Sequence, residues 1–246
     1  MIRRIALFGL TAGLALATTQ AESARTSVAR DFPVYDNGGQ PDLTLDPQRF
    51  VAQMEIIDRY FDPVADQCVF EEFAVGSTGW RRLLRFDTVI LNSGDGDLVV
   101  GNRADPQNPY ADYFYFAGCH GHYHIRDFAK YELLTADGTQ VARGEKQGFC
   151  MEDSFKYDGT RSAGYNCDYQ GITSGWGDWY YKQLPGQWID ITGVPEGDYI
   201  VRASVNGGLD ADQRIFDEGE DRYPNFVEVQ IHVPDPRNKV DGTWKN

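Results

Sequence analysis

The sequence predicts a mainly β protein, folded as a single β-sandwich-like domain with long functional loops. Short stretches rich in β-branched and aromatic residues recur along the chain, and clusters of Gly, Asn and Asp close many of them. Long stretches with a helical period are few. The roughly 225 residues that follow an N-terminal leader suffice for one large domain with a real core. These features are typical of a β-sandwich.

The first 21 residues have the pattern of a secretory signal peptide. Arg3 and Arg4 precede the apolar run IALFGLTAGLALA, and small residues lead to Ala21, after which we expect cleavage. The run is too short for a comfortable membrane span, and no later stretch is apolar enough to cross a bilayer. We therefore expect a secreted protein, extracellular or periplasmic. Residues 22–40 are expected to form a flexible lead-in, and residues 41–246 the folded domain.

The first element of the domain is ambiguous, and the second is a clear strand. RFVAQMEIIDRYF (49–61) fits a helical face through Phe50, Met54, Ile57 and Phe61, but the stretch from Val51 also fits an extended strand. RRLLRFDTVILNSG (81–94) is apolar and β-branched and ends in a turn cluster, which predicts a strand.

Three later stretches predict further strands. KYELLTADGTQVARGEK (130–146) is interpreted as strand, Asp-Gly hairpin and strand. QWIDITGVPEGDYIVRASVN (187–206) holds two strands about a Pro-Glu-Gly turn, and NFVEVQIHV (225–233) alternates apolar and polar residues. Residues 95–118 and 151–186 are rich in Gly, Asp, Tyr and Trp and are poor strand candidates. We expect ordered functional loops there.

The charge balance is strongly acidic. The chain has 23 basic and 37 acidic residues, for a formal net charge of −14. Such a surface repels nucleic acid and anionic membranes and attracts cationic ligands, among them amines and basic peptides. The same charge also fits a second interpretation, in which it only keeps an exported protein soluble.

The four cysteines predict two disulfides. They are Cys68, Cys119, Cys150 and Cys167, an even number in an exported chain. Four cysteines allow three pairings, and the spacing alone does not choose among them.

Three of the four histidines lie at alternate positions within five residues. His120, His122 and His124 could share one face of a strand, which is a metal-ligand arrangement. On a flat strand the outer two Cα atoms lie roughly 13 Å apart, so the rings barely reach one ion. We therefore predict a bend at Gly118 and Gly121. An all-imidazole site suits copper, zinc or iron, and a zinc hydrolase with water at the open position is the rival to copper.

Around these histidines the chain resembles the lysyl oxidase family. CHGHYH resembles the family's copper-binding segment, and VARGEKQGFCMED (141–153) resembles the segment around its cofactor lysine. GITSGWGDWYYKQLPGQWIDITGVPEGDY (171–199) is similar to the segment that carries the cofactor tyrosine. The resemblance covers roughly residues 41 to 230, in order and at similar spacing, and identifies residues 41–246 as a lysyl oxidase-like catalytic domain.

The resemblance implies two cofactors and the residues that carry them. Copper would be held by His120, His122 and His124, and Lys146 and Tyr180 would join to form lysine tyrosylquinone. Tyr181 is the neighbour that competes with Tyr180 in the alignment. A lysine attacks well only when it is neutral, which burial favours, and a quinone carbonyl is an electrophile for amines. For the base that removes a substrate proton, the candidates are Asp127 and Asp178.

The resemblance also implies a disulfide pairing. Cys167 aligns with the family's partner of Cys119, so Cys119–Cys167 is the first expected bond. Cys68 and Cys150 lack the close partners that their counterparts have in the family, so Cys68–Cys150 is the second.

A calcium site is a further implication. Some family members hold calcium between a Pro-Asp-Leu segment and an acidic loop, and the chain has both Pro41-Asp42-Leu43 and EGEDRYPNF (218–226). The candidate oxygen ligands are Asp42, Glu218, Glu220, Asp221 and Asn225. The alternative is a solvated acidic loop without an ion.

The resemblance implies a secreted copper amine oxidase of protein-lysine 6-oxidase type. It would convert primary amines or peptidyl lysine to aldehydes with O₂, releasing hydrogen peroxide and ammonia. Its partner would be an amine or a lysine-containing peptide or protein, with no nucleic acid and no membrane span. The alternatives are a copper-binding extracellular scaffold without the quinone and a three-histidine zinc hydrolase, for which no carboxylate stands beside the histidines in sequence. The sequence leaves the physiological substrate and the oligomeric state open.

Overall fold

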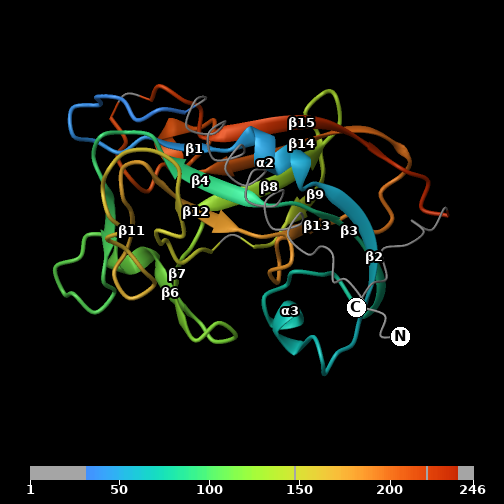
Figure 1. Ribbon diagram of the computed structural model, residues 1–246. Helices are drawn as coiled ribbons and strands as arrows, with labels where there is room; N and C mark the ends of the chain where they lie inside the picture. The colour runs from blue at the N-terminus through green and yellow to red at the C-terminus, as the bar shows by residue number, and fades with distance from the viewer. Residues whose placement is uncertain (1–31, 147, 220, 238–246) are drawn as a thin grey trace, which may run out of the picture.

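The computed structural model describes residues 32–146, 148–219 and 221–237. The expected signal peptide, residues 1–21, lies outside these ranges, as does part of the lead-in. The described chain is mainly β and folds as the predicted sandwich-like domain, with antiparallel sheets in layers (Figure 1). No helix among the described residues has the length and apolarity that a membrane crossing requires.

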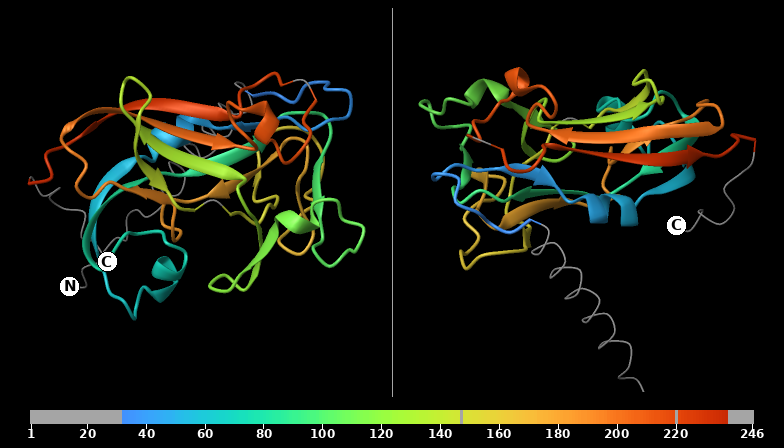
Figure 2. Two further views of the ribbon diagram at one scale, coloured as in Figure 1. Left: turned by 180° about the vertical axis from the view of Figure 1, so that it is seen from behind. Right: turned by 90° about the horizontal axis from the view of Figure 1, so that it is seen from above.

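The core lies between two four-stranded sheets. One has the order β15-β14-β8-β9, and the other has the order β1-β4-β12-β10. Strand β1 packs against β14 and β15, and the main apolar cluster fills the space between the sheets. A third sheet, β13-β3-β2, continues this body, with β13 against β8 and β9. Figure 2 shows the same layers from behind and from above.

The strands and helices are short. The strands are β1 (Leu43–Leu45), β2 (Glu55–Phe61), β3 (Gly79–Arg85), β4 (Thr88–Asn92), β5 (Leu98–Gly101), β6 (Phe114–Ala117), β7 (His122–Ile125), β8 (Ala129–Leu134), β9 (Gln140–Gly144), β10 (Phe155–Lys156), β11 (Gln170–Ile172), β12 (Trp176–Tyr180), β13 (Trp188–Asp190), β14 (Gly197–Val205) and β15 (Phe226–Val233). The helices are α2 (Pro47–Ala52) and α3 (Gln67–Glu71), with 3₁₀ turns at Ala111–Tyr113 and Ala211–Gln213.

The ambiguous stretch 49–61 contains both of its predicted structures in succession. Helix α2 begins after Asp46, whose carboxylate accepts hydrogen bonds from the amides of Gln48 and Arg49. The helix ends at Ala52, and strand β2 follows from Glu55. The 81–94 stretch is likewise divided, because the chain leaves β3 after Arg85 and enters β4 at Thr88.

The predicted hairpin and the later strands are confirmed, but the prediction for the two loops was partly wrong. Strands β8 and β9 pair across the Asp-Gly turn, and β14 and β15 form the longest pairing. Residues 95–118 and 151–186 contain five short strands, namely β5, β6, β10, β11 and β12. Among them, β12 is buried against β4 in the centre of a sheet, so glycine and aromatic residues there serve packing.

Two segments extend from the same side of the sandwich, the lower side in Figure 1. One is the histidine hairpin, residues 114–125, in which β6 pairs with β7. The other is the α3 segment, residues 62–78, which contains α3. The candidate site lies where these two segments meet the ends of β9 and β12.

Candidate metal and cofactor site

The histidine hairpin bends where the sequence predicts a bend. The amides of His120 and Gly121 donate to the carbonyl of Ala117 at 3.0 and 2.9 Å, and Gly121 has a φ of +74°, which glycine adopts without steric cost. His120 therefore lies in the turn, while His122 and His124 lie on one face of β7.

The bend brings the three imidazole rings together. Their centroids lie 4.9 to 5.9 Å apart, and Nε2 of His122 is 3.0 Å from Nε2 of His124. The hydroxyl of Tyr115 lies 3.4 Å from Nδ1 of His124. Among the described residues, the ring nitrogens of the three histidines do not all lie within 4.8 Å of one another. His122 and His124 are the closest pair of the three rings, and the ring of His120 lies 5.0 Å from that of His124 and 5.9 Å from that of His122.

Burial and neighbouring charge favour the neutral form of two of these imidazoles, those of His122 and His124. His124 is only 4% exposed, and burial together with Lys146 lowers its pKa to about 3. Burial, followed by the charges of His120 and Lys146, also lowers the pKa of His122. Neutral imidazole is the form that binds a metal ion, so His122 and His124 have the form that a metal ligand requires.

Lys146 and Tyr180 are neighbours. Nζ of Lys146 lies 5.6 Å from the centroid of the Tyr180 ring and 5.2 Å from that of Phe149. Lys146 follows β9, and Tyr180 ends β12, so the two residues reach each other from separate sheets. Gly186, with a φ of +76°, has its Cα beside the Lys146 side chain, where a Cβ would come within 3.1 Å of it.

Tyr180 is held firmly, and its competitor Tyr181 points elsewhere. The Tyr180 hydroxyl donates to the carbonyl of Cys150, and its ring packs edge-on against Phe149 at 4.5 Å. Tyr181 is 48% exposed and stacks on Trp179 at 4.6 Å between centroids. The geometry therefore favours Tyr180 as the partner of Lys146.

Lys146 lies in a setting that favours the neutral amine. Burial lowers its pKa, and the negative charges of Glu72 and Asp178 counteract part of that shift. A neutral amine has the free electron pair that a nucleophile requires.

The two candidate bases lie in very different places. Asp178 is 2% exposed on β12, two residues before Tyr180, and accepts a hydrogen bond from the Ser154 hydroxyl at 3.2 Å. Burial raises its pKa to about 8. Asp127 is exposed and lines a separate cavity with Lys130 and Arg214, so the structure does not bring it to Lys146.

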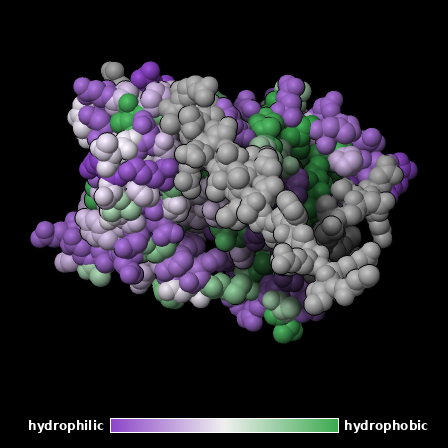
Figure 3. All heavy atoms as spheres, in the orientation of Figure 1, coloured by the Kyte–Doolittle hydropathy of each residue, from purple (hydrophilic) through white to green (hydrophobic). Residues whose placement is uncertain are grey.

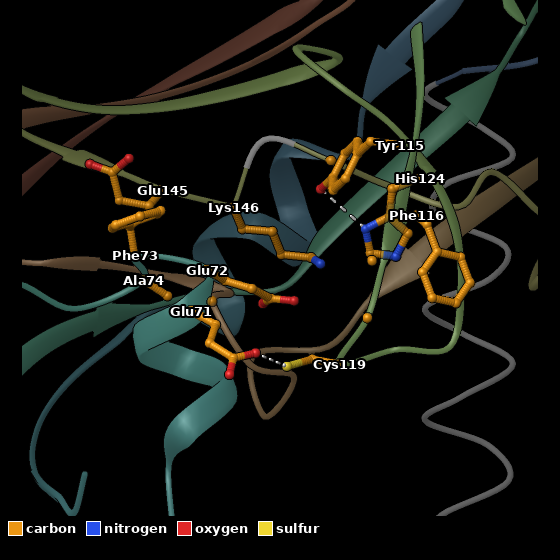
Figure 4. Close-up of a pocket in the computed structure, with 14 residues that line it drawn as sticks. Glu71, Glu72, Phe73, Ala74, Tyr115, Phe116, Cys119, His124, Glu145 and Lys146 are labelled. Carbon is orange, nitrogen blue, oxygen red and sulfur yellow. Dashed lines mark hydrogen bonds between the residues drawn. The ribbon is translucent and has the colours of Figure 1, made fainter.

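A cavity of about 370 Å³ opens onto Lys146 and His124 (Figure 4). Its wall includes Tyr115 and three carboxylates that sequence reasoning missed: Glu71, Glu72 and Glu145.

Glu71 and Glu72 come from the α3 segment, whose exposed apolar residues include Val64 and Phe73. Hydrophobic surface gathers over this segment at the lower edge of the molecule (Figure 3). Glu71 and Glu72 stand three and four residues after Cys68, and no local sequence pattern marks them or Glu145 as site residues.

Both disulfides are present, but the predicted pairing was wrong. Cys68 bonds to Cys119, and Cys150 bonds to Cys167. The expected Cys119–Cys167 bond fails because the α3 segment, and not the loop before Tyr180, lies beside Cys119. The loop before Tyr180 still reaches the hairpin, because the Gln170 side chain donates to the carbonyl of Tyr123 at 2.6 Å.

The predicted calcium ligands gather at the opposite end of the β1 sheet. Carboxylate oxygens of Asp42, Glu218 and Asp221 lie within 4.8 Å of one another. Oδ1 of Asp42 and Oδ1 of Asn225 are buried and accept no hydrogen bond from the described residues. Asp221 also pairs with Arg214, and burial raises the pKa of Glu218 to about 7. Glu220 lies outside the described residues.

Comparison with known proteins gives a consistent set of relatives. The family model described as lysyl oxidase matches residues 63–229. Lysyl oxidase homolog 2 of Homo sapiens is 34% identical over 199 residues, which are 76% of this chain and 24% of that protein. Lysyl oxidase homolog 2A of Danio rerio is 38% identical over 198 residues, 76% of this chain and 25% of that protein. The chain thus spans about a quarter of the length of these relatives.

Proposed function

The chain belongs to the lysyl oxidase family, and from that premise we propose that it is a copper-dependent amine oxidase of the lysyl oxidase type. The reaction takes a primary amine, O₂ and water to an aldehyde, ammonia and hydrogen peroxide. The substrates are primary amines, among them the side chain of lysine in peptides or proteins.

The observation that carries the proposal is the contact between Lys146 and Tyr180 beside His124. Nζ of Lys146 lies 5.6 Å from the Tyr180 ring centroid, within a cavity that His124 also lines. A structural lysine in a mainly β protein would be expected at the surface with its charge solvated. Here burial favours the neutral amine, which is the form that a covalent link to an oxidised tyrosine needs.

The histidine cluster fits copper. His122 and His124 have Nε2 atoms 3.0 Å apart, close to the spacing of two ligands that share one ion at about 2.0 Å each. Three neutral imidazoles suit copper, which heads the affinity order of divalent metals. Copper, when bound, supplies the redox chemistry by which O₂ oxidises the Tyr180 ring. The rival zinc hydrolase gives no role to the buried contact of Lys146 with Tyr180.

Lys146 and Tyr180 would hold the second cofactor, lysine tyrosylquinone. The quinone, once formed, supplies an electrophilic carbonyl toward the amine of the substrate. The protein contributes the position of the ring, which the Tyr180–Cys150 hydrogen bond and Phe149 fix. It also contributes a partly enclosed cavity at Lys146, whose carboxylates attract a cationic amine.

Asp178 is our proposed proton acceptor for the α-carbon of the substrate. It is buried on the strand that carries Tyr180 and shares a sheet face with it. The Ser154 hydroxyl holds one carboxylate oxygen. A carboxyl whose pKa is about 8 is a stronger base, once ionised, than an ordinary aspartate.

Calcium and secretion complete the proposal. Asp42, Glu218, Asp221 and Asn225 offer the hard oxygens that calcium prefers, and two of these oxygens have no protein partner among the described residues. Two disulfides are typical of an oxidising compartment outside the cytosol, which agrees with export through an N-terminal signal peptide.

Peroxide release from simple primary amines tests the proposed activity. The copper-loaded full chain should release hydrogen peroxide, and Lys146→Arg should not, because arginine keeps the charge but does not become a neutral amine. Lys130→Arg, an exposed lysine outside the cavity, is the matched control and should keep full activity. Copper-loaded protein without peroxide release would favour a scaffold that kept the fold alone.

A further inference from the structure

Glu72 is the carboxylate that approaches the histidine cluster. It follows α3, and the Cys68–Cys119 disulfide ties this segment to the residue that precedes His120. Figure 4 shows the Glu72 side chain extending into the cavity near the end of Lys146. A negative charge therefore reaches the histidine cluster from Glu72, which precedes His120 by 48 residues in sequence.

The contact between Glu72 and His120 is short but is not a hydrogen bond. Oε1 of Glu72 lies 2.8 Å from Nε2 of His120. That nitrogen is buried and has no hydrogen-bond partner among the described residues, so the contact lacks the geometry of a hydrogen bond. A lone pair of oxygen and a lone pair of nitrogen this close repel each other unless a proton or a cation lies between them.

The spacing matches two ligands of one metal ion. Ligand atoms bonded at about 2.0 to 2.1 Å, at angles between a right angle and a tetrahedral one, lie roughly 2.8 to 3.4 Å apart. The Glu72–His120 contact of 2.8 Å and the His122–His124 contact of 3.0 Å both fall in this range. The four donors thus form two close pairs, and the ring centroids of His120 and His124, one from each pair, lie 5.0 Å apart.

The charge of Glu72 has no other strong partner. In the described ranges, no lysine or arginine nitrogen forms a salt bridge with its carboxylate, and the charge acts on Lys146 from a distance. Glu71, by contrast, lies against Gln67 and the sulfur of Cys119. Glu72 is therefore the carboxylate of this pair that remains available to a cation.

We propose that Glu72 is a fourth protein ligand of the copper ion, joining His120, His122 and His124 through a carboxylate oxygen. The inference rests on the proposed copper function. The carboxylate also reduces the net charge of a divalent ion bound by three neutral imidazoles. The Cys68–Cys119 disulfide then has a defined purpose, because it holds this ligand beside the hairpin.

Copper binding itself tests the proposal without reference to activity. The full chain is produced without copper, and Cu(II) is titrated against a competing chelator for wild type, Glu72→Gln and the matched control Glu71→Gln. We expect Glu72→Gln to weaken copper affinity about 10- to 100-fold and to change the Cu(II) electron paramagnetic resonance (EPR) spectrum. Glu71→Gln should leave both the affinity and the spectrum unchanged.

A second variant keeps the test decisive if Glu72→Gln folds poorly. Glu72→His retains a donor at this position and should retain copper, with one additional nitrogen coupling in the EPR spectrum. Wild-type affinity and spectrum in Glu72→Gln would overturn the proposal. So would a loss of affinity with an unchanged spectrum, which would mean that Glu72 only orients His120, or a Glu72→His spectrum without the extra nitrogen. A wild-type chain that binds no copper would instead overturn the proposed function.

Discussion

At the scale of single residues, burial prepares the site chemically. Burial lowers the pKa of His124 to about 3 and also lowers the pKa of Lys146, so it disfavours the charged form of both side chains. The alternate spacing of the histidines and the family motifs predict these residues directly. Glu72 could not be predicted, because its contact with His120 joins distant parts of the chain and no local pattern encodes it.

Asp178 gives a pH-dependent prediction. Burial raises its pKa to about 8, so the carboxyl holds its proton below that pH and can accept one only above it. If Asp178 is the base, kcat/KM for a small amine should rise with pH through about 8. Asp178→Asn should lower the rate about 10²- to 10⁴-fold and remove this limb of the profile. A profile that keeps the limb in Asp178→Asn would exclude Asp178 as the base.

The same carboxyl also predicts how stability depends on pH. Below about pH 4 the group is protonated in both the folded and the unfolded chain. As the pH rises toward about 8, only the unfolded chain loses the proton, so the free energy of unfolding falls. Between these pH values, the melting temperature of wild type should therefore fall more steeply than that of Asp178→Asn. Parallel curves for the two proteins would contradict the raised pKa.

At the scale of elements, the sequence predicts the long, regular pieces and misses the short ones. The Asp-Gly hairpin between β8 and β9 has both alternation and turn chemistry, so it is predictable. Strands such as β10, with two residues, and β11, with three, are too short for a period to be read. The disulfide pairing was missed because the position of the α3 segment depends on tertiary packing.

The α3 segment gives a prediction about the disulfides. Non-reducing peptide mapping should recover Cys68–Cys119 and Cys150–Cys167. Removing the first bond with Cys68→Ala and Cys119→Ala should cost about 2 to 4 kcal/mol of stability and weaken copper binding, since the α3 segment is no longer held at the hairpin. Replacing Cys150 and Cys167 together is the comparison. Recovery of a Cys119–Cys167 peptide would contradict the account.

The acidic end of the β1 sheet gives a separate prediction. Calcium at about 100 times its dissociation constant should stabilise the fold by about 2.7 kcal/mol. Asp42→Asn should abolish the calcium-induced rise in melting temperature, because Asp42 supplies a buried, unpartnered oxygen. The rise should shrink below about pH 7, where Glu218 takes up a proton. Asp198→Asn, in an exposed carboxylate, should leave it unchanged; a calcium response retained by Asp42→Asn would mean that the ion binds elsewhere.

At the scale of the whole molecule, the mainly β architecture serves as a frame that joins distant segments. The sandwich follows from recurrent strand patterns, and this class was predictable. The site is built from segments on one side of this frame (Figure 1), where the hairpin, the α3 segment and the residues after β9 meet. These segments are far apart in sequence and meet only because the sheets pack together. No local sequence pattern predicts that packing.

The net charge of −14 predicts a preference for cationic substrates. The value of kcat/KM for a basic lysine peptide should fall as salt rises from about 0.01 M to about 1 M, since the screening length shrinks from about 30 Å to about 3 Å. An acidic lysine peptide of equal length should be a poorer substrate and should improve with salt. Equal salt responses for the two peptides would mean that the acidic surface serves solubility alone.

The most direct measurement is peptide mass spectrometry of the full chain after copper loading in air. The account predicts one covalently linked pair of peptides, joining Lys146 to Tyr180, in wild type and in Tyr181→Phe. The linked pair should be absent from Lys146→Arg, from Tyr180→Phe and from protein kept free of copper. Separate, unmodified Lys146 and Tyr180 peptides from fully copper-loaded, aerated wild type would contradict the central claim.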